Sequence, residues 1–326
     1  MNHGLKIAGI VFFLWIGLTA KSQVEHGLIS FSNKLLINPS YAGFNRDTHI
    51  SSSLLFNARP EKNLNNNFSL TYDTWSEKMQ GGVSLRFHQG LIGKQNTNIT
   101  GAGFAFTKPF DLAKRRQFIP SFSLNLHTAT KQWFVHLIDR TIDKSFEHQS
   151  PPGEEFLRFA AVQPGVGLLW NSPAVEIGAA ATYSFYQELG EEPDELSRFP
   201  LSVVFHAAKK KRGKRNGLIS QPVKASPEAV VIFSENVFMS RVGLRLERVD
   251  HQLGIFAQND FMWNSHGIGG AYSWKLNNLR LHLSAGTTYS VPHKKAAFFG
   301  EAALGLIIPY IQINDKNPWA PPPRSF

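Results

Sequence analysis

The stretch Leu279–Ser290 reads LRLHLSAGTTYS. Leucine, alanine, threonine and tyrosine occupy every second position, and arginine, histidine, serine, glycine and threonine occupy the positions between them. Because successive side chains of a β-strand point to opposite faces, this order gives one strand an apolar face and a polar face. The stretch therefore predicts a strand that separates an apolar environment from a wet or plugged interior.

The same period of two recurs along most of the chain, for example in residues 83–88, 121–126 and 175–186. Many of the alternating segments have about 10–13 residues, which exceeds the usual strand of about 5–6 residues and fits the roughly 9–11 that a tilted strand needs to cross a bilayer. We count about fourteen candidate strands, with boundaries good to a few residues. They lie near residues 48–59, 66–76, 80–88, 97–109, 116–136, 156–171, 173–187, 199–208, 227–235, 237–248, 251–260, 266–275, 278–290 and 297–309.

Further features favour a membrane barrel over a soluble sandwich, which would also alternate. Aromatic residues recur at segment ends, where an interfacial girdle would lie: Trp75, Trp170, Tyr186, Trp274, Tyr289 and Tyr310. Tight connections such as Asn277-Asn278 alternate with longer ones, which predicts that the tight turns lie on the periplasmic side. We therefore predict an all-β fold, a closed transmembrane antiparallel β-barrel of about fourteen strands with a short N-terminal segment and a proline-rich C-terminal tail.

The composition excludes several other classes of protein. Aromatic residues make up 12% of the chain, and 26 glycines and 18 prolines disfavour a helical bundle. Cysteine is absent, so disulfides, a lipid-anchored cysteine, a thiolate zinc site and a cysteine nucleophile are excluded. Such a chain, once exported, must be held together by its core or by a closed ladder of hydrogen bonds.

The N-terminus has the features of a cleaved export signal. Lys6 precedes an apolar run over residues 7–18, which is shorter than the roughly 20 residues of a membrane-spanning helix. Ala20-Lys21-Ser22 then has the small-x-small form of a cleavage site, although an uncleaved anchor is the alternative. The predicted organisation is a signal peptide over residues 1–22, a lead-in or plug over 23–47, an outer-membrane barrel over 48–310 and a periplasmic tail over 311–326.

A turn with the sequence LINPSYAG, residues 36–43, lies between the signal and the first strand. Pro39 fixes its own φ and moves Asn38 out of the α region, and Gly43 permits backbone geometry that other residues resist. On local grounds this is a capped turn before a strand. The same pattern also resembles the PorP/SprF family of outer-membrane proteins of Bacteroidetes, as do Gly81-Gly82 and the spacing of the last six strands. The residues of this signature turn are Asn38, Pro39, Tyr41, Ala42 and Gly43.

The resemblance implies a non-enzymatic component of the type IX secretion and gliding machinery. Members of the family work with periplasmic motor or ring components and support the secretion or surface attachment of particular large proteins and adhesins. On this hypothesis the signature turn lies at the periplasmic mouth, and Tyr41 is either a rim anchor or part of a plug contact. The alternative is a passive or FadL-like channel for small solutes. The sequence leaves open which secreted protein is served and whether the lumen is open.

Residues 209–215 form the strongest concentration of charge. The six cations are Lys209, Lys210, Lys211, Arg212, Lys214 and Arg215. An export signal excludes a nuclear signal or a nucleic-acid patch. The strand count places the stretch on the periplasmic rim, opposite the acidic loop over residues 188–195, whose spacing is not that of a calcium loop. The basic stretch is either a solvated loop or a docking contact for an acidic periplasmic partner or for the phosphates of outer-membrane lipids and lipopolysaccharide.

Four arginines fall on the polar faces of predicted strands: Arg86, Arg241, Arg245 and Arg280. They either satisfy other polar groups inside the lumen or line a small anion-selective pore. The histidines lack zinc spacing, and the chain has neither a Gly-x-Ser-x-Gly elbow nor a phosphate-binding glycine loop. We therefore expect no metal, no cofactor and no catalytic residue. A Ser-His pair hidden in the barrel wall, as in an outer-membrane lipase, is a third hypothesis that a serine-reactive probe would test.

Overall fold

The computed structural model describes residues 33–58, 64–92, 97–112, 115–131, 159–188, 201–210, 223–234, 237–262, 264–292 and 294–309. Two short 3-10 helices, η1 (Lys34–Leu36) and η2 (Pro39–Tyr41), precede the strands. The strands are β1 (Thr48–Ala58), β2 (Leu64–Ser76), β3 (Gly81–Ile92), β4 (Thr97–Thr107), β5 (Phe110–Leu112), β6 (Arg116–Lys131), β7 (Phe159–Asn171), β8 (Val175–Tyr183), β9 (Phe185–Glu188), β10 (Leu201–Lys209), β11 (Lys224–Ser234), β12 (Val237–Arg248), β13 (His251–Asp260), β14 (Ser265–Leu276), β15 (Leu279–Ser290) and β16 (Lys295–Ile308).

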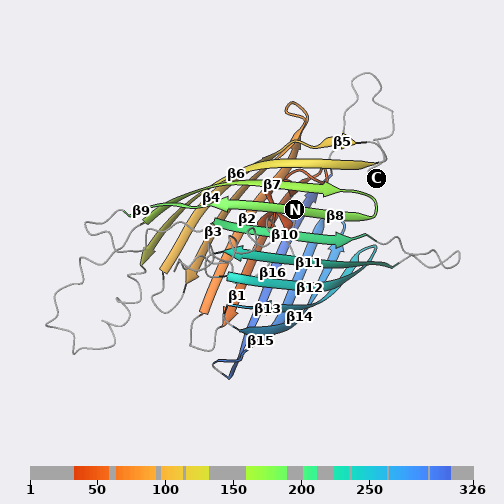
Figure 1. Cartoon of the computed structure of the whole chain (residues 1–326). Coiled ribbons are helices and arrows are strands. Elements are labelled where there is room, and N and C mark those ends of the chain that lie inside the picture. Colours follow the sequence, from red (N-terminus) through yellow and green to blue (C-terminus); the bar gives the residue numbers. More distant parts are fainter. Residues whose placement is uncertain are drawn as a thin grey trace, which may run out of the picture.

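The strands form one antiparallel sheet that closes on itself (Figure 1). The first strand, β1, pairs with β2 on one side and with the last strand, β16, on the other. β5 continues the line of β4 along β6, and β9 continues the line of β8 along β7. The sixteen strands therefore make a wall of fourteen, which confirms the predicted barrel of about fourteen strands.

One of the two interruptions has a local cause in the sequence. Residues 108–109 separate β4 from β5, and Pro109 has no N–H to give to the ladder. The predicted strand over 173–187 is likewise divided, with Ser184 standing between β8 and β9. β3 ends four residues later than predicted, and the predicted stretches 132–136 and 156–158 lie outside the described residues. The other described bounds agree with the prediction within three residues, and those of β12 and β13 coincide with it.

The alternation seen in Leu279–Ser290 corresponds to an outer and an inner face. Leu283 is 49% exposed on the outside, whereas its neighbour His282 is only 5% exposed on the inside. The wall as a whole follows this rule. Its exposed large apolar side chains are mostly leucine, phenylalanine, isoleucine and valine, with some tyrosine and tryptophan, and many of its buried inward side chains are serine, threonine and histidine. An apolar outside and a polar inside are what a barrel in a lipid bilayer requires.

The aromatic girdle is present in part. Trp274 is 41% exposed on the outer face near the tight turn that follows β14, and Tyr289 is 48% exposed near the opposite end of β15. The prediction was wrong for Trp75, which shares the inner face of β2 with Asp73 and lies beneath the guanidinium of Arg46, 5.0 Å from the ring centroid. Its ring covers the chain that leads into β1, so burial inside the barrel overrides its position at a strand end.

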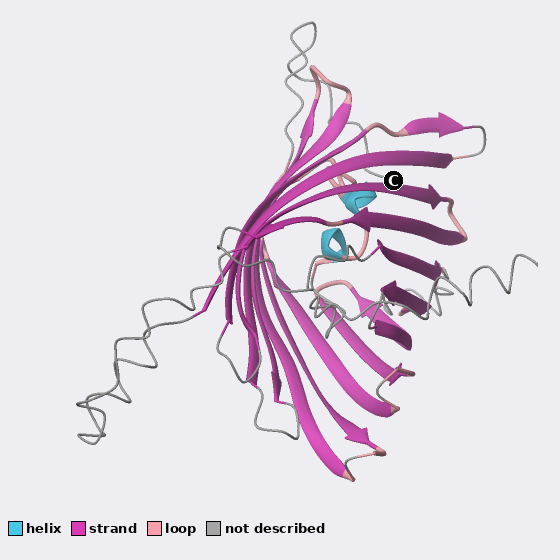
Figure 2. Cartoon of the chain, turned by 60° about the vertical axis from the view of Figure 1, so that its left-hand side comes forward, coloured by secondary structure: helices cyan, strands magenta, loops and turns pink. Residues whose placement is uncertain are grey.

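The core lies inside the lumen, where the chain before β1 meets the wall (Figure 2). One apolar cluster contains Tyr41, Ile119 and Leu169, with Leu35 and Phe44 packed against it. A second contains Val230, Ile232 and Met239, and Ile37 from the N-terminal segment packs against it. Among the described residues no helix is long and apolar enough to cross a membrane. The predicted signal peptide and tail, the acidic loop 189–195 and Tyr310 lie outside the described residues.

Candidate functional site

The tight-turn end of the barrel is the end that carries the connections 77–80, 172–174, 249–250 and 277–278. The N-terminal segment of residues 33–43, which we call the plug, lies inside the barrel (Figure 2) and contacts the wall near this end, for example through the Ala42 carbonyl and Thr107. Two asparagines shape it by capping its short helices. The carbonyl oxygen of the Asn33 side chain accepts from the Leu35 N–H, and that of Asn38 accepts from the Ser40 N–H at 2.9 Å. Pro39 occupies the first helical position, where its missing N–H costs nothing. The sequence therefore specifies the plug locally, before any contact with the wall.

The amide of Asn38 joins the plug to two wall strands. This side chain is completely buried, and its Nδ2 donates to the carbonyl oxygens of Leu168 on β7 at 3.0 Å and Ala179 on β8 at 3.2 Å. Nε2 of His206 on β10 lies 3.0 Å from the same nitrogen. Because a buried donor without partners is costly, this position favours an amide over an aspartate or an apolar residue.

Glycines in the wall let the plug approach closely. A Cβ on Gly82 would lie 1.9 Å from the Ala42 carbonyl oxygen, and one on Gly167 would lie 2.4 Å from Oδ1 of Asn38. Gly43 itself has a φ of +60°, and its N–H donates to Oδ1 of Asp73 at 2.5 Å. The plug backbone therefore sits directly on the wall at these points, and side chains are excluded there.

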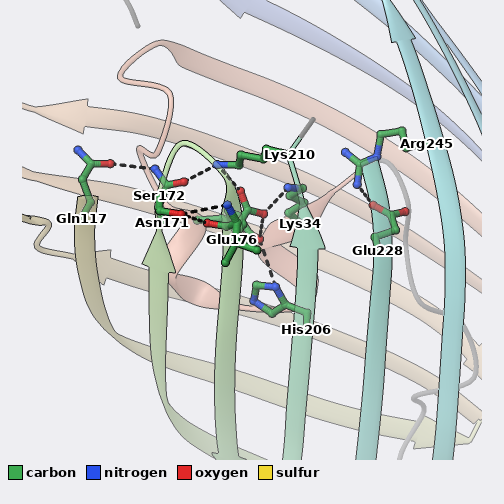
Figure 3. A network of polar contacts seen from close by, with 11 residues as sticks. Lys34, Gln117, Asn171, Ser172, Glu176, His206, Lys210, Glu228 and Arg245 are labelled. Carbon is green, nitrogen blue, oxygen red and sulfur yellow. Dashed lines mark hydrogen bonds and ion pairs between the residues drawn. The ribbon is translucent and has the colours of Figure 1, made fainter. Parts of the chain in front are cut away.

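A buried carboxylate lies at the centre of the polar contacts around the plug (Figure 3). Glu176, near the start of β8, is 2% exposed. Its Oε1 lies 2.7 Å from Nζ of Lys34 and accepts a hydrogen bond from the Tyr41 hydroxyl, and its Oε2 lies 3.2 Å from Nζ of Lys210. The Tyr41 oxygen is also 3.3 Å from Nδ1 of His206. One carboxylate thus binds two residues of the plug and one residue that follows β10.

The environment fixes the protonation of the plug side chains. Burial raises the pKa of Tyr41 well above its ordinary value, and the negative charge of Glu176 acts in the same direction. Enclosure lowers the pKa of Lys34, while the Glu176 carboxylate acts against that change. Tyr41 therefore stays a hydrogen-bond donor to Glu176 throughout the neutral pH range. These contacts hold the plug in position.

A small cavity of about 40 Å³ remains between the plug and strands β8 and β10–β12. That volume has room for a few water molecules. Its lining combines Glu176 and His206 with Glu228 and Arg245, which form an ion pair between β11 and β12. Within the described residues no group of three or more acidic or histidine side chains is arranged to hold a metal ion.

The four arginines singled out in the sequence lie on the inner face. The structure brings two of them together, because Arg241 and Arg245 both line the small cavity, whereas Arg86 and Arg280 are not part of that lining. Arg86 donates to Oδ1 of Asn125 at 2.9 Å. Arg241 donates to Oε1 of Gln258 at 2.9 Å and lies over the ring of Phe256, 4.4 Å from its centroid. Arg245 pairs with Glu228, and Arg280 occupies an inward position on β15 two residues before His282.

The basic stretch is only partly described. Lys209 ends β10 on its outer face, whereas Lys210 turns toward the plug and reaches Glu176, Asn171 and the ring of Phe44. The remaining predicted cations, at positions 211, 212, 214 and 215, lie outside the described residues. Docking of a partner or lipid on this stretch stays a prediction.

Glu176, His206, Asp73 and the wall glycines were not predicted as site residues. Alternation does place Glu176 on the polar face of its strand, and it is the one carboxylate in the segment 175–186. Nothing local, however, links it to Tyr41, which lies 135 positions earlier. The signal available in the sequence was an acidic residue on an inward strand position beside a tight turn.

Among the residues that the structure describes, Ser273 and His282 form a Ser-His pair of the kind considered from the sequence. Oγ of Ser273 lies 2.6 Å from Nδ1 of His282, whose Nε2 is 3.8 Å from Oε2 of Glu301. All three side chains are at most 6% exposed and lie within paired strands. An acyl-transfer site also needs hydrogen-bond donors aimed at the oxyanion, and backbone amides inside a sheet ladder are already engaged with neighbouring strands. The group fits a polar contact within the wall better than a nucleophile.

No model of a known protein family matches the chain, and no curated protein matches it. Solved structures do. CdiB from Acinetobacter baumannii aligns over 80% of this chain with a TM-score of 0.50 and 7% identity, and the chain spans 60% of the length of CdiB. A variant of the Rh. blastica porin has a TM-score of 0.34, with 7% identity over 80% of this chain and 99% of the porin. The KdgM porin, solved in complex with disordered oligogalacturonate, has a TM-score of 0.34, with 8% identity over 79% of this chain and 98% of KdgM. The similarity to CdiB shows the fold alone, that of an outer-membrane β-barrel.

Proposed function

We propose that this barrel is a non-enzymatic component of the type IX secretion and gliding machinery, as its resemblance to the PorP/SprF family implies. The observation that carries the proposal is the position of the signature turn. Asn38 and Tyr41, two residues of that resemblance, are the residues that fasten the plug to β7, β8 and β10. The signature then has a physical role, because it specifies a barrel that is occupied by its own chain at the tight-turn end.

The mechanism we propose is anchoring. The wall holds the protein in the outer membrane, and the plug occupies the lumen near the tight turns, so that rims and loops supply the contacts with other proteins. The partners would be periplasmic motor or ring components and a secreted surface protein or adhesin. A carboxylate shared by the plug and Lys210 keeps the periplasmic end of the barrel in one conformation for such contacts.

Affinity purification from outer membranes tests the proposal. Wild-type protein should retain periplasmic components of the machinery, and deletion of the gene should abolish secretion or surface attachment of one large protein while other secreted proteins remain. Replacement of all six cations of the basic stretch by glutamine should weaken the complex in a salt-sensitive way. Unchanged secretion in the deletion strain, together with no co-purifying periplasmic protein, would contradict the proposal.

The second candidate is an outer-membrane channel or FadL-like transporter for small solutes. The inward arginines and the small cavity beside the plug favour it. In a planar bilayer, a channel would conduct, and Arg86→Gln or Arg280→Gln would change its ion selectivity. If the wild-type protein does not conduct, and the deletion strain fails to secrete one specific protein, the anchoring function is favoured over the channel.

A further inference from the structure

The outer face of the wall has an unusual distribution of charge. Along each strand the outward positions are those that alternate with the buried inward side chains. Among the described residues, counting residues 108–109 that link β4 and β5, no outward position holds a carboxylate, and four hold a permanent cation. The four are Lys108, Arg116, Lys209 and Arg248, and all of them are exposed.

Register and exposure establish the outward direction of each cation. Lys108 lies in alternation between Phe104 and Phe110, which are 40% and 50% exposed, and its N–H donates to the carbonyl of Pro120 on β6. Arg116 precedes Phe118, which is 37% exposed, by two positions. The outward direction of Lys209 and Arg248 follows from the same alternation.

Lys209 belongs to the same face of β10 as Phe205, which is 49% exposed. Arg248 belongs to the same face of β12 as Val242, which is 53% exposed. Arg116 begins a strand, whereas Lys209 and Arg248 end theirs, and Lys108 directly follows β4. Because the strands are antiparallel, these positions all fall at the tight-turn end of the barrel.

In the part of the chain that the structure describes, the opposite end lacks such charges on its outer face. The outward residues described there include Phe56, Phe185, Leu201, Phe238 and Tyr289, all of them uncharged. The four cations are therefore an asymmetric feature of the lipid-facing surface. They border the apolar outer face at one end of the barrel only.

We propose that Lys108, Arg116, Lys209 and Arg248 form a belt that binds the phosphate groups of anionic phospholipids in the leaflet at the tight-turn end. Long basic side chains keep their stems along apolar surface while their charged heads reach the headgroup level. Cations held near an anionic bilayer surface attract its lipids, and no described carboxylate at an outward strand position opposes them. Lipid is the favoured partner over an acidic protein because the belt is continuous with the surface that already faces the hydrocarbon. The inference does not depend on the proposed role in secretion.

Spin-label measurements of lipid association test the belt. The full-length barrel is reconstituted in phosphatidylcholine bilayers that carry a trace of spin-labelled phosphatidylglycerol or spin-labelled phosphatidylcholine. The motionally restricted fraction should show a preference for phosphatidylglycerol of about twofold averaged over the lipid shell, because only lipids beside the four cations gain. The Lys108→Gln/Arg116→Gln/Lys209→Gln/Arg248→Gln variant should lower this preference to near unity.

The matched control removes four cations from the same end that do not occupy outward strand positions, by Lys78→Gln/Arg115→Gln/Lys224→Gln/Lys275→Gln. It has the same net charge as the belt variant and should keep the preference. Equal loss in both variants, or no headgroup preference in the wild type, would overturn the proposal. So would abolition of the preference by inorganic phosphate at constant ionic strength, because that result indicates a site for soluble anions. Heat-modified migration on gels confirms that each variant is folded before it is measured.

Discussion

The two sides of the lumen satisfy the same polar interior in different ways. From β2 to β10 the inner wall is fitted to the plug, with glycines beneath its backbone and buried side chains that bond to it. From β11 to β16 the inner side chains bond to neighbouring strands, as in Arg245 with Glu228 and Ser273 with His282. There the glycines make room for aromatic rings instead, with Gly269 under Phe256 and Gly286 under Phe299.

This difference shows that the alternation of apolar and polar residues predicts which side chains face inward but not what those side chains contact. Both sides present the same apolar outer face. The polar groups of one side bond to a distant segment of chain, whereas the polar groups of the other bond to adjacent strands, and the plug meets that side through the packing of Ile37 on β11 and β12. Variants on the plug side should therefore release the plug as well as lower stability, whereas variants on the other side should affect stability only. Because the chain has no cysteine, a single Ser40→Cys substitution reports on the plug, since Ser40 is completely buried.

The largest effect is expected for Gly82→Ala. Its Cβ would lie 1.9 Å from the carbonyl oxygen of Ala42 and 2.7 Å from Cα of Gly43. Because these are backbone atoms, no side-chain rotation relieves the contact, and we expect a loss of about 3 kcal/mol in the free energy of unfolding. Urea unfolding in lipid vesicles measures the loss, and maleimide labelling at Ser40→Cys should become rapid. Gly305→Ala is the control, because the atom nearest to its Cβ is 3.8 Å away. Similar losses at the two glycines would remove the distinction between the two sides.

Removal of the central charge should have the next largest effect. Glu176→Gln keeps the shape of the side chain but leaves Lys34 and Lys210 facing a neutral amide, and we expect a loss of about 2 kcal/mol because both lysines are about one-third exposed. Glu228→Gln, which affects the single partner Arg245, should cost less and leave labelling at Ser40→Cys slow. Rapid labelling in both variants would show that the plug depends on both sides of the wall.

Tyr41→Phe should cost about 1 kcal/mol at pH 8 through loss of the hydrogen bond to Glu176. The cost should shrink as the pH rises above 10. Burial, and then Glu176, raise the pKa of Tyr41 in the folded protein, so its stabilisation is complete below the unfolded pKa and is lost above it. Parallel unfolding curves of the wild type and the variant at pH 8 and pH 11 measure this change. A constant difference between them would contradict the burial of the hydroxyl.

The smallest effect concerns a tight turn on the other side of the barrel. Val249, between β12 and β13, has a φ of +39°, a region that β-branched residues rarely adopt. Val249→Asn should raise the free energy of unfolding by about 0.5–1 kcal/mol, because asparagine tolerates this conformation, as Asn277 does at the turn after β14. Labelling at Ser40→Cys should not change. The opposite exchange at the other turn, Asn277→Val, should lower the free energy of unfolding by a similar amount.

Much of the fold follows from local chemistry in the sequence. The alternation in Leu279–Ser290 determined which residues face lipid because burial and strand geometry share a period of two. The prediction for Trp75 was wrong because a position at a strand end does not reveal which face of the sheet the side chain occupies. Trp75 faces inward, where its ring packs against Arg46 in the segment that precedes β1. The asparagine caps and Pro39 predicted a turn, but they carried no information about where it docks.

The site could be predicted only in part for a related reason. Contacts such as Asn38 with Leu168 or Tyr41 with Glu176 join segments that no periodicity relates. Gly82 and Gly167 are required only because the plug lies against them. The sequence shows that they are glycines within strands but does not predict this close approach. Lys210 belonged to a run of similar cations, and nothing in that run distinguished the residue that turns inward.

The connection between the plug and β1 has a consequence for any molecule that would open the lumen. Only residues 44–47 separate Gly43 from the first strand, so the plug is a ligand tethered beside its own binding site. A short tether holds a ligand at an effective concentration in the millimolar range or above. A free competitor with the same contacts would have to exceed that concentration, and a plug severed from β1 by proteolysis would lose the advantage and dissociate as an ordinary peptide.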